Sequence, residues 1–161
     1  MTTIRAARPA EYEAIGELSA RAYTESGNLS TDIDYTMVLR DAARQAEQAE
    51  LLVAIEDDEV RGTVTLVRPG SAYADVARPG ELEFRMLAVA PEAAGNGVGQ
   101  ALVEAVIDRA RADGMERVVL CVRDSVEPAQ RLYRRLGFER RPDRDWHPAP
   151  DVNLLGYALE L

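Results

Sequence analysis

The chain has 161 residues and a formal net charge of −9; it contains one His and one Cys, and all 19 basic residues are Arg. The absence of Lys excludes a P-loop lysine and a lysine Schiff base, and one His with one Cys cannot form a Cys- or His-rich zinc site or an intrachain disulfide. The acidic charge argues against a nucleic-acid partner. The sequence also lacks a run of about 18 apolar residues and a signal peptide at Met1–Arg5, so we expect one cytoplasmic domain over residues 1–161 with no membrane partner.

Charge is distributed unevenly along the chain. Residues 1–84 carry 16 acids and 8 Arg, whereas residues 109–144 carry 10 Arg and 6 acids. A basic segment attracts an anionic ligand, and the acidic N-terminal half attracts a cationic one. The alternative is that these Arg side chains lie on solvated helix faces and pair with nearby carboxylates.

The N-terminal half is predicted to contain strands and helices in alternation. Spacing of apolar residues predicts a strand at 3–7, a helix at 9–23, a second helix from a cap at Ser30 or Thr31 to about Ala49, and a hairpin of strands 51–55 and 60–67. In the second helix the positions expected to face inward are Ile33, Met37, Ala42 and Ala46.

The C-terminal half continues the alternation. The predicted elements are a strand at 81–89, a helix at 98–112, a strand at 117–122, a short helix capped by Ser125 that ends at Gly137, and final strands at 138–141 and 154–161 joined by a loop. Along 81–89 the side chains alternate, with Leu82, Phe84, Met86 and Ala88 on one face and Glu83, Arg85, Leu87 and Val89 on the other. This order of elements predicts a single mixed α/β domain.

Three alternating glycines, Gly95, Gly97 and Gly99, separate the strand at 81–89 from the following helix. Glycines let backbone N–H groups converge on one point, and a helix N-terminus adds unpaired donors and a positive dipole end. The turn therefore predicts an anion site, for which a nucleotide pyrophosphate is a natural occupant. A Rossmann fingerprint has a different glycine spacing and lies in the first βαβ unit. A tight strand–helix corner without a ligand is the open alternative.

The segments 83–91 and 95–102 together resemble the acyl-CoA-binding motif of the GNAT superfamily of N-acetyltransferases, and 129–138 resembles that family's second signature. The resemblance implies a mixed, mostly antiparallel sheet of about six or seven strands flanked by about four helices, with two splayed central strands. It also implies acetyl-CoA as cosubstrate, no metal and no covalent enzyme intermediate.

The resemblance assigns the cofactor-binding residues. The pantetheine arm would pair with the strand at Leu87, Ala88 and Val89, and the pyrophosphate would lie on the turn formed by Ala94, Gly95, Asn96, Gly97, Val98, Gly99 and Gln100. Two positions depart from the family pattern. Ala94 stands where Arg or Gln is usual, and Val126 stands where Asn is frequent, with Asp124 or Ser125 as polar substitutes.

The resemblance also gives candidate catalytic residues. Glu83 is the candidate general base, acting directly or through water, and Tyr133 is the candidate general acid beside the CoA sulfur. Structural roles are the alternatives: Glu83 could form an ion pair with Arg85, and Tyr133 could pack in the core. The thioester oxygen would be polarised by a backbone N–H of Val89 or a neighbour.

The acceptor side is less defined by the sequence. Candidate acceptor-binding residues are Tyr23, Tyr35, Trp146 and His147, the last also an alternative base; Cys121 is expected in the core. The resulting hypothesis is an N-acetyltransferase acting on a primary amine of a small molecule or on a protein N-terminus. A catalytically silent CoA-binding sensor and an enzyme for longer acyl chains remain alternatives, and a homodimer is open because the family often dimerises.

Overall fold

The computed structural model describes residues 1–25 and 33–161. The helices are α1 (Tyr12–Glu25), α2 (Ile33–Arg40), α3 (Ala42–Gln48), α4 (Val98–Ala112) and α5 (Glu127–Arg135), with short 3-10 helices η1 (Pro9–Glu11), η2 (Pro91–Ala93) and η3 (Pro142–Arg144). The strands are β1 (Thr3–Ala6), β2 (Glu50–Glu56), β3 (Glu59–Val67), β4 (Glu81–Val89), β5 (Arg117–Arg123), β6 (Glu139–Arg140), β7 (Trp146–Ala149) and β8 (Val152–Glu160). No helix within these ranges has the length and apolar character needed to cross a membrane.

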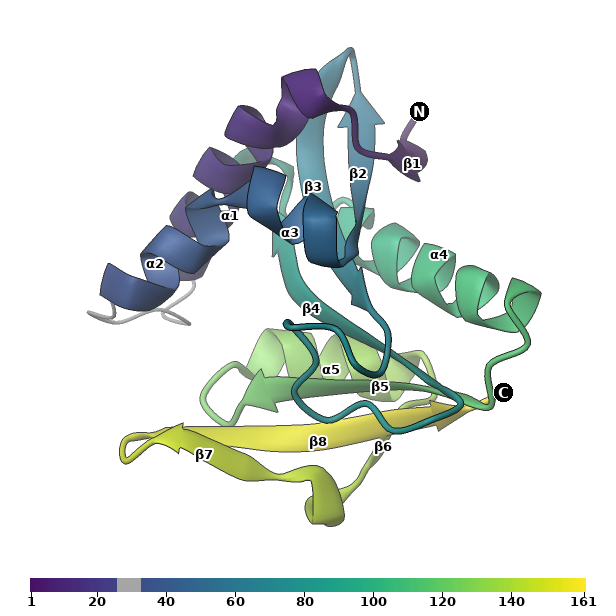
Figure 1. Cartoon of the computed structure of the whole chain (residues 1–161). Coiled ribbons are helices and arrows are strands. Elements are labelled where there is room, and N and C mark those ends of the chain that lie inside the picture. The colour runs from purple at the N-terminus through teal and green to yellow at the C-terminus, as the bar shows by residue number, and fades with distance from the viewer. Residues whose placement is uncertain (26–32) are drawn as a thin grey trace.

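The strands form one eight-stranded sheet in the order β1-β2-β3-β4-β5-β8-β6, with β7 also paired to β8 (Figure 1). Neighbouring strands are antiparallel except β4 and β5, which run parallel because α4 connects them. The predicted mixed, mostly antiparallel architecture is confirmed. The structure adds β7, which occupies the region expected to be a loop.

The two halves of the sheet are joined by a short parallel ladder. β4 pairs with β5 only through Glu81↔Arg117, Leu82↔Val118 and Glu83↔Val119. Beyond this point the two strands diverge, as the angle between the upper and lower strands in Figure 1 shows. The rest of β4 keeps β3 as its partner, and the rest of β5 keeps β8. The splayed central strands are therefore present.

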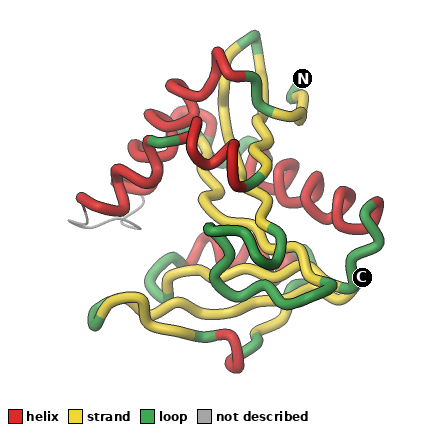
Figure 2. The backbone as a smooth tube through the Cα atoms, viewed as in Figure 1, coloured by secondary structure: helices red, strands yellow, loops and turns green. Residues whose placement is uncertain are grey.

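Helices cover both faces of the upper half-sheet because its strands bury apolar residues on both sides. One cluster contains Ile15 of α1 and Ala42 of α3 with Leu51 and Val53 of β2. The main cluster lies on the other face, where the alternate residues of β2 and β3 pack against α4. In the lower half, α5 lies behind β5 and the irregular 68–80 connection lies in front of it (Figure 2).

Two helix predictions need correction. The helix expected to reach Ala49 is divided at Asp41, whose carboxylate accepts a hydrogen bond from the N–H of Arg44 and so begins α3. Met37, expected to face inward, is 65% exposed. Ala42 is buried and Ala46 packs against the same cluster, while Ser30, Thr31 and the side chain of Ile33 lie outside the described residues.

The cap of the short helix was also placed one residue early. Val126, not Ser125, is the N-cap of α5, and its side chain makes no capping hydrogen bond. Asp124 instead accepts a hydrogen bond from the side chain of Asn153. The helix ends two residues before Gly137, which adopts a positive φ of 99°.

A β-bulge in β4 breaks the predicted alternation of its side chains. The register passes from Thr63↔Ala88 to Thr65↔Arg85, so β4 carries one extra residue there, and Met86 has a φ of 57°. Met86 consequently packs with Leu39 in a separate cluster, not with Phe84 in the main one as expected. Leu87 and Val89 pack against the main cluster, so they do not share the surroundings of Glu83.

Candidate active site

The glycine turn lies where β4 ends and α4 begins. Gly95 and Gly97 have φ values of 82° and 81°, and Gly97 is the N-cap of α4. A Cβ added at either glycine would meet no atom within 4 Å, so the backbone there borders open space. The first N–H groups of α4 have no carbonyl partner within the helix. The turn therefore fits an anionic group that approaches the backbone closely.

The turn is close to both strand β4 and helix α5. A Cβ at Gly99 would lie 3.6 Å from side-chain atoms of Val89 and of Leu132. Gln100, in the first turn of α4, accepts a hydrogen bond from Arg135 of α5 at 3.2 Å and donates one to Glu104 at 2.8 Å. A cationic side chain is thus held beside the turn, while Ala94 and Asn96 are exposed on it.

Much of the positive charge of the 109–144 segment is neutralised locally. Six of its Arg side chains form ion pairs with carboxylates, namely Arg109, Arg117, Arg134, Arg140, Arg141 and Arg144. These six Arg side chains therefore follow the alternative in which Arg side chains pair with nearby carboxylates. Arg135, which bonds to the Gln100 amide, is better placed to act on an anion at the turn.

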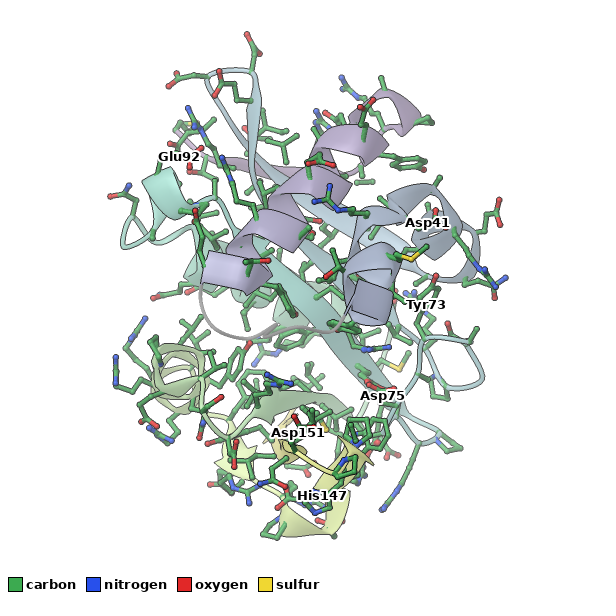
Figure 3. The ribbon with its side chains drawn as sticks, turned by 90° about the vertical axis from the view of Figure 1, so that its left-hand side faces the viewer. Asp41, Tyr73, Asp75, Glu92, His147 and Asp151 are labelled. Carbon is green, nitrogen blue, oxygen red and sulfur yellow. The ribbon has the colours of Figure 1, made fainter. Side chains whose placement is uncertain are left out.

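Glu83 is enclosed by the loop that precedes β4. Its Oε1 accepts hydrogen bonds from the N–H groups of Asp75, Val76 and Ala77, each at 3.0 Å, and its side chain has no exposed surface. Burial raises the pKa of the Glu83 carboxyl, and these backbone donors oppose the rise. Glu83 therefore anchors the 75–77 loop to β4 (Figure 3 shows Asp75 beside this strand).

Arg85 pairs with Asp75, not with Glu83. Its Nε lies 3.1 Å from Oδ2 of Asp75, and its Nη1 donates to the carbonyl of Tyr73 at 2.8 Å. The ion-pair alternative for Glu83 named Arg85 as the partner and needs correction. Asp75 lies in a connection without periodicity, so no sequence pattern indicated it.

Tyr133 lies in an aromatic cluster of the main core. Its ring is 5.7 Å from that of Phe84 in an edge-to-face arrangement, and the rings of Phe138 and Tyr157 are 6.0 and 6.2 Å away. Burial raises the pKa of the Tyr133 phenol well above its usual value. The hydroxyl therefore keeps its proton at neutral pH, which is the form a general acid requires.

The two tyrosines expected on the acceptor side lie together. Tyr23 of α1 and Tyr35 of α2 have ring centroids 6.0 Å apart, and Tyr23, Tyr35 and Tyr73 all pack against the Leu39–Met86 cluster. The Arg85 guanidinium acts on the pKa of both Tyr23 and Tyr35, which places it beside them. Tyr73 was not anticipated from the sequence.

Trp146 and His147 lie on β7, and Figure 3 shows His147 well away from Asp75. His147 is exposed, whereas Trp146 is partly buried beside Cys121. Cys121 is itself only partly buried, and burial together with the charges of Glu83 and Asp75 raises the pKa of its thiol to about 12. Trp146 thus belongs to the surroundings of β5.

A buried ion pair fixes the far side of the same loop. Arg144 of η3 donates to both carboxylate oxygens of Glu81, at 2.8 and 2.7 Å, and to the carbonyl of Val76 at 2.8 Å. Burial would raise the pKa of Glu81, but hydrogen bonds from Arg144, the N–H of Arg78 and Arg117 lower it to about 2. Neither residue was a sequence candidate, because Glu81 reads as an ordinary strand end and Arg144 as part of a polar loop.

Comparison with known proteins identifies the relatives of this arrangement. Residues 12–138 match the model of the acetyltransferase (GNAT) family. A mycothiol acetyltransferase of Sanguibacter keddieii is 35% identical over 147 residues, which cover 86% of this chain and 44% of that protein. The chain thus spans less than half the length of that relative.

Two solved structures share the fold over nearly the whole chain. The ribosomal-protein-S18-alanine N-acetyltransferase of Escherichia coli superposes with a TM-score of 0.72 at 23% identity, covering 99% of this chain and 94% of that one. The PaiA N-acetyltransferase of Thermoplasma acidophilum, solved with coenzyme A, gives a TM-score of 0.73 at 14% identity, with coverage of 97% and 98%. At these identities the likeness concerns the fold.

Proposed function

Because the chain belongs to the acetyltransferase (GNAT) family, we propose that it transfers an acetyl group from acetyl-CoA to a primary amine. The observation that carries the proposal is the divergence of β4 from β5, which leaves the end of β4 that leads to the glycine turn unpaired with β5. A strand edge and a helix N-terminus are thereby available at one place. The edge suits the amide-containing pantetheine arm, and the helix N-terminus suits the pyrophosphate.

The residues of this region fit acetyl-CoA. Open space at Gly95 and Gly97 admits the pyrophosphate to the backbone, and Arg135 stands beside Gln100 to supply a positive charge. The turn from Ala94 to Gln100 and the β4 segment from Leu87 through Ala88 to Val89 would hold the cosubstrate. When bound, acetyl-CoA supplies a thioester-activated acetyl group.

Side chains near the strand divergence carry out the proton transfers of the proposed reaction. Tyr133 holds its phenolic proton and donates it to the sulfur that leaves. A backbone N–H of Val89 or a neighbour stabilises the charge that develops on the acyl oxygen. Glu83 is enclosed by the 75–77 loop, so proton transfer to its carboxylate requires a bridging water molecule.

The acceptor is an amine of a small molecule or the N-terminus of a protein, and Tyr23 and Tyr35 line its approach. Acidic residues predominate in the N-terminal half, which favours a cationic acceptor. The relatives support both acceptor classes, since one is named for mycothiol and another for a ribosomal-protein alanine. A homodimer would be compatible with either.

Calorimetric titration with acetyl-CoA, followed by a thiol-release assay, tests the proposal. The acceptor probes are a short peptide with N-terminal alanine, unacetylated mycothiol, spermidine and glucosamine, and mass spectrometry identifies the acetylated nitrogen. We expect saturable binding of acetyl-CoA and release of CoA that depends on one of these amines. Failure to bind acetyl-CoA would contradict the proposal.

A catalytically silent CoA-binding domain is the second candidate. It is favoured by Ala94, which supplies no side-chain donor to the turn, and by Val126, which gives α5 no side-chain cap. This candidate predicts acetyl-CoA binding without turnover of any amine. It also predicts that Tyr133→Phe has little effect on the Kd for acetyl-CoA.

A further inference from the structure

Asp75 is the carboxylate beside the strand divergence that an acceptor can reach. Its side chain is 19% exposed, whereas that of Glu83 has no exposed surface. Oδ2 of Asp75 pairs with Nε of Arg85 at 3.1 Å. The carboxylate is therefore held in place while part of its surface stays open to a ligand.

The position of Asp75 is set by the two diverging strands. The β4–β5 ladder ends at Glu83↔Val119, and Arg85 and Cys121 stand two residues farther along β4 and β5. Asp75 contacts Arg85 directly, and its charge acts on the pKa of the Cys121 thiol. Its carboxylate thus lies beside β4 just past the last β4–β5 pair, on the side that faces the lower half of the molecule (Figure 3).

The loop that carries Asp75 is held from two sides. The N–H groups of residues 75–77 bind Glu83, and the carbonyl of Val76 binds Arg144, which is fixed by Glu81. The three side chains that hold the loop, those of Glu81, Glu83 and Arg144, are buried. A loop held in this way presents its carboxylate in one orientation, as a residue that must meet a reacting group requires.

We propose that Asp75 binds the ammonium group of the acceptor and takes its proton. This inference rests on the proposed transfer of acetyl to an amine. Asp75 accepts H⁺ from R–NH₃⁺, leaving R–NH₂ and a neutral carboxyl. The amine nitrogen then bonds to the acyl carbon while the C–S bond breaks, the sulfur takes the Tyr133 proton, and the amide nitrogen loses its second proton to water. Asp75 then releases its proton to solvent, and Tyr133 takes a proton from solvent.

The charged and titratable groups around Asp75 are Arg85 and Glu83 of β4, Cys121 of β5 and Tyr35 of α2. Burial raises the pKa of the Asp75 carboxyl, and Arg85 opposes the rise. Arg85 keeps enough negative charge on Asp75 to attract an ammonium, and burial makes the carboxylate a stronger base than an exposed one.

The test compares Asp75→Asn with the wild type, using the amine among the four probes that gives the highest wild-type rate. We expect kcat/KM for that amine to fall by about 10²-fold or more at pH 7, with the Kd for acetyl-CoA within about twofold of the wild-type value. Because the variant depends on amine that is already neutral, its kcat/KM should rise about tenfold per pH unit up to the pKa of the amine. Asp108→Asn, at an exposed position of α4, makes the same charge change and should leave kcat/KM unchanged.

A variant of Arg85, the ion-pair partner of Asp75, distinguishes a catalytic role for Asp75 from a purely structural one. If Asp75 only neutralises Arg85, the Asp75→Asn/Arg85→Gln double variant should recover wild-type kcat/KM, and that recovery would overturn the proposal. If the wild type is active and Asp75→Asn has the same kcat/KM, the role proposed for Asp75 is overturned, while the proposed function stays intact. An inactive wild type that binds acetyl-CoA would overturn the proposed acetyl transfer and this inference together.

Discussion

The Arg144 guanidinium holds the Glu81 carboxylate through two hydrogen bonds, of 2.8 and 2.7 Å, and both side chains are almost completely buried. Glu81 stands at the first residue of β4 and pairs with Arg117 at the first residue of β5. The ion pair therefore lies at the junction of the two half-sheets, and its loss should affect the whole molecule.

Arg144→Met should lower the free energy of unfolding by about 3–5 kcal/mol, because it leaves the Glu81 carboxylate buried without its principal partner. Urea denaturation of the two proteins measures the difference. Arg141→Met is the matched control: Arg141 pairs with Asp143 at an exposed site, so its loss should cost about 1 kcal/mol or less. Equal losses of unfolding free energy in the two variants would show that the buried ion pair stabilises the fold no more than the exposed one.

The pH dependence of the Tm of Glu81→Gln should reveal the contribution of the same ion pair to stability. The pKa of Glu81 is lowered to about 2 in the folded protein, so its ionised form stabilises the fold above the pKa of about 4.3 that glutamate has when unfolded. This contribution is lost as pH falls toward 2. The difference in Tm between wild type and Glu81→Gln should thus be constant near neutrality and shrink below about pH 4. A difference independent of pH would contradict the assigned cause.

Gly97→Ala should weaken cosubstrate binding beyond its effect on stability. A φ of 81° costs an alanine about 1 kcal/mol, and the added Cβ would enter the open space that we assign to the pyrophosphate. Gly114→Ala carries a similar backbone cost, with φ of 70° and no atom within 4 Å, at the far end of α4. Calorimetry should show a higher Kd for acetyl-CoA only in Gly97→Ala, with similar losses of Tm in both variants.

Tyr133→Phe should keep the fold and slow the reaction. The ring contacts with Phe84 and Phe138 remain, while the protonated phenol is removed, so we expect kcat to fall by about 10²-fold with little change in Tm. Tyr157→Phe reverses the pattern, because the Tyr157 hydroxyl bonds to Gln130 and Arg134. That variant should lose about 1 kcal/mol of stability and keep its kcat.

The sequence predicted the parts of the fold that depend on local patterns. Apolar spacing located the main helices and strands, and the glycine turn was visible because positive φ angles require that residue type. The bulge at Met86 was missed because a single extra residue leaves no mark on an apolar strand. The division at Asp41 was missed because the flanking helices share a helical pattern.

The site was only partly accessible to the same reasoning. Glu83 and Tyr133 were identified through motif resemblance, yet the enclosure of Glu83 arises from N–H groups that no side-chain pattern records. Arg144 bonds to the carbonyl of Val76, the neighbour of Asp75, across 68 residues of sequence, and such a long-range contact has no local signature.

The extra residue at Met86 determines how β4 would respond to the deletion of a residue. Because side chains in a strand alternate with a period of two, the bulge puts the two ends of β4 out of phase. Deleting Met86 would restore a regular ladder with β3 and exchange the faces on which Leu87, Ala88 and Val89 present their side chains. A one-residue deletion there, unlike one in the exposed β2–β3 turn, would invert the end of the strand next to the glycine turn.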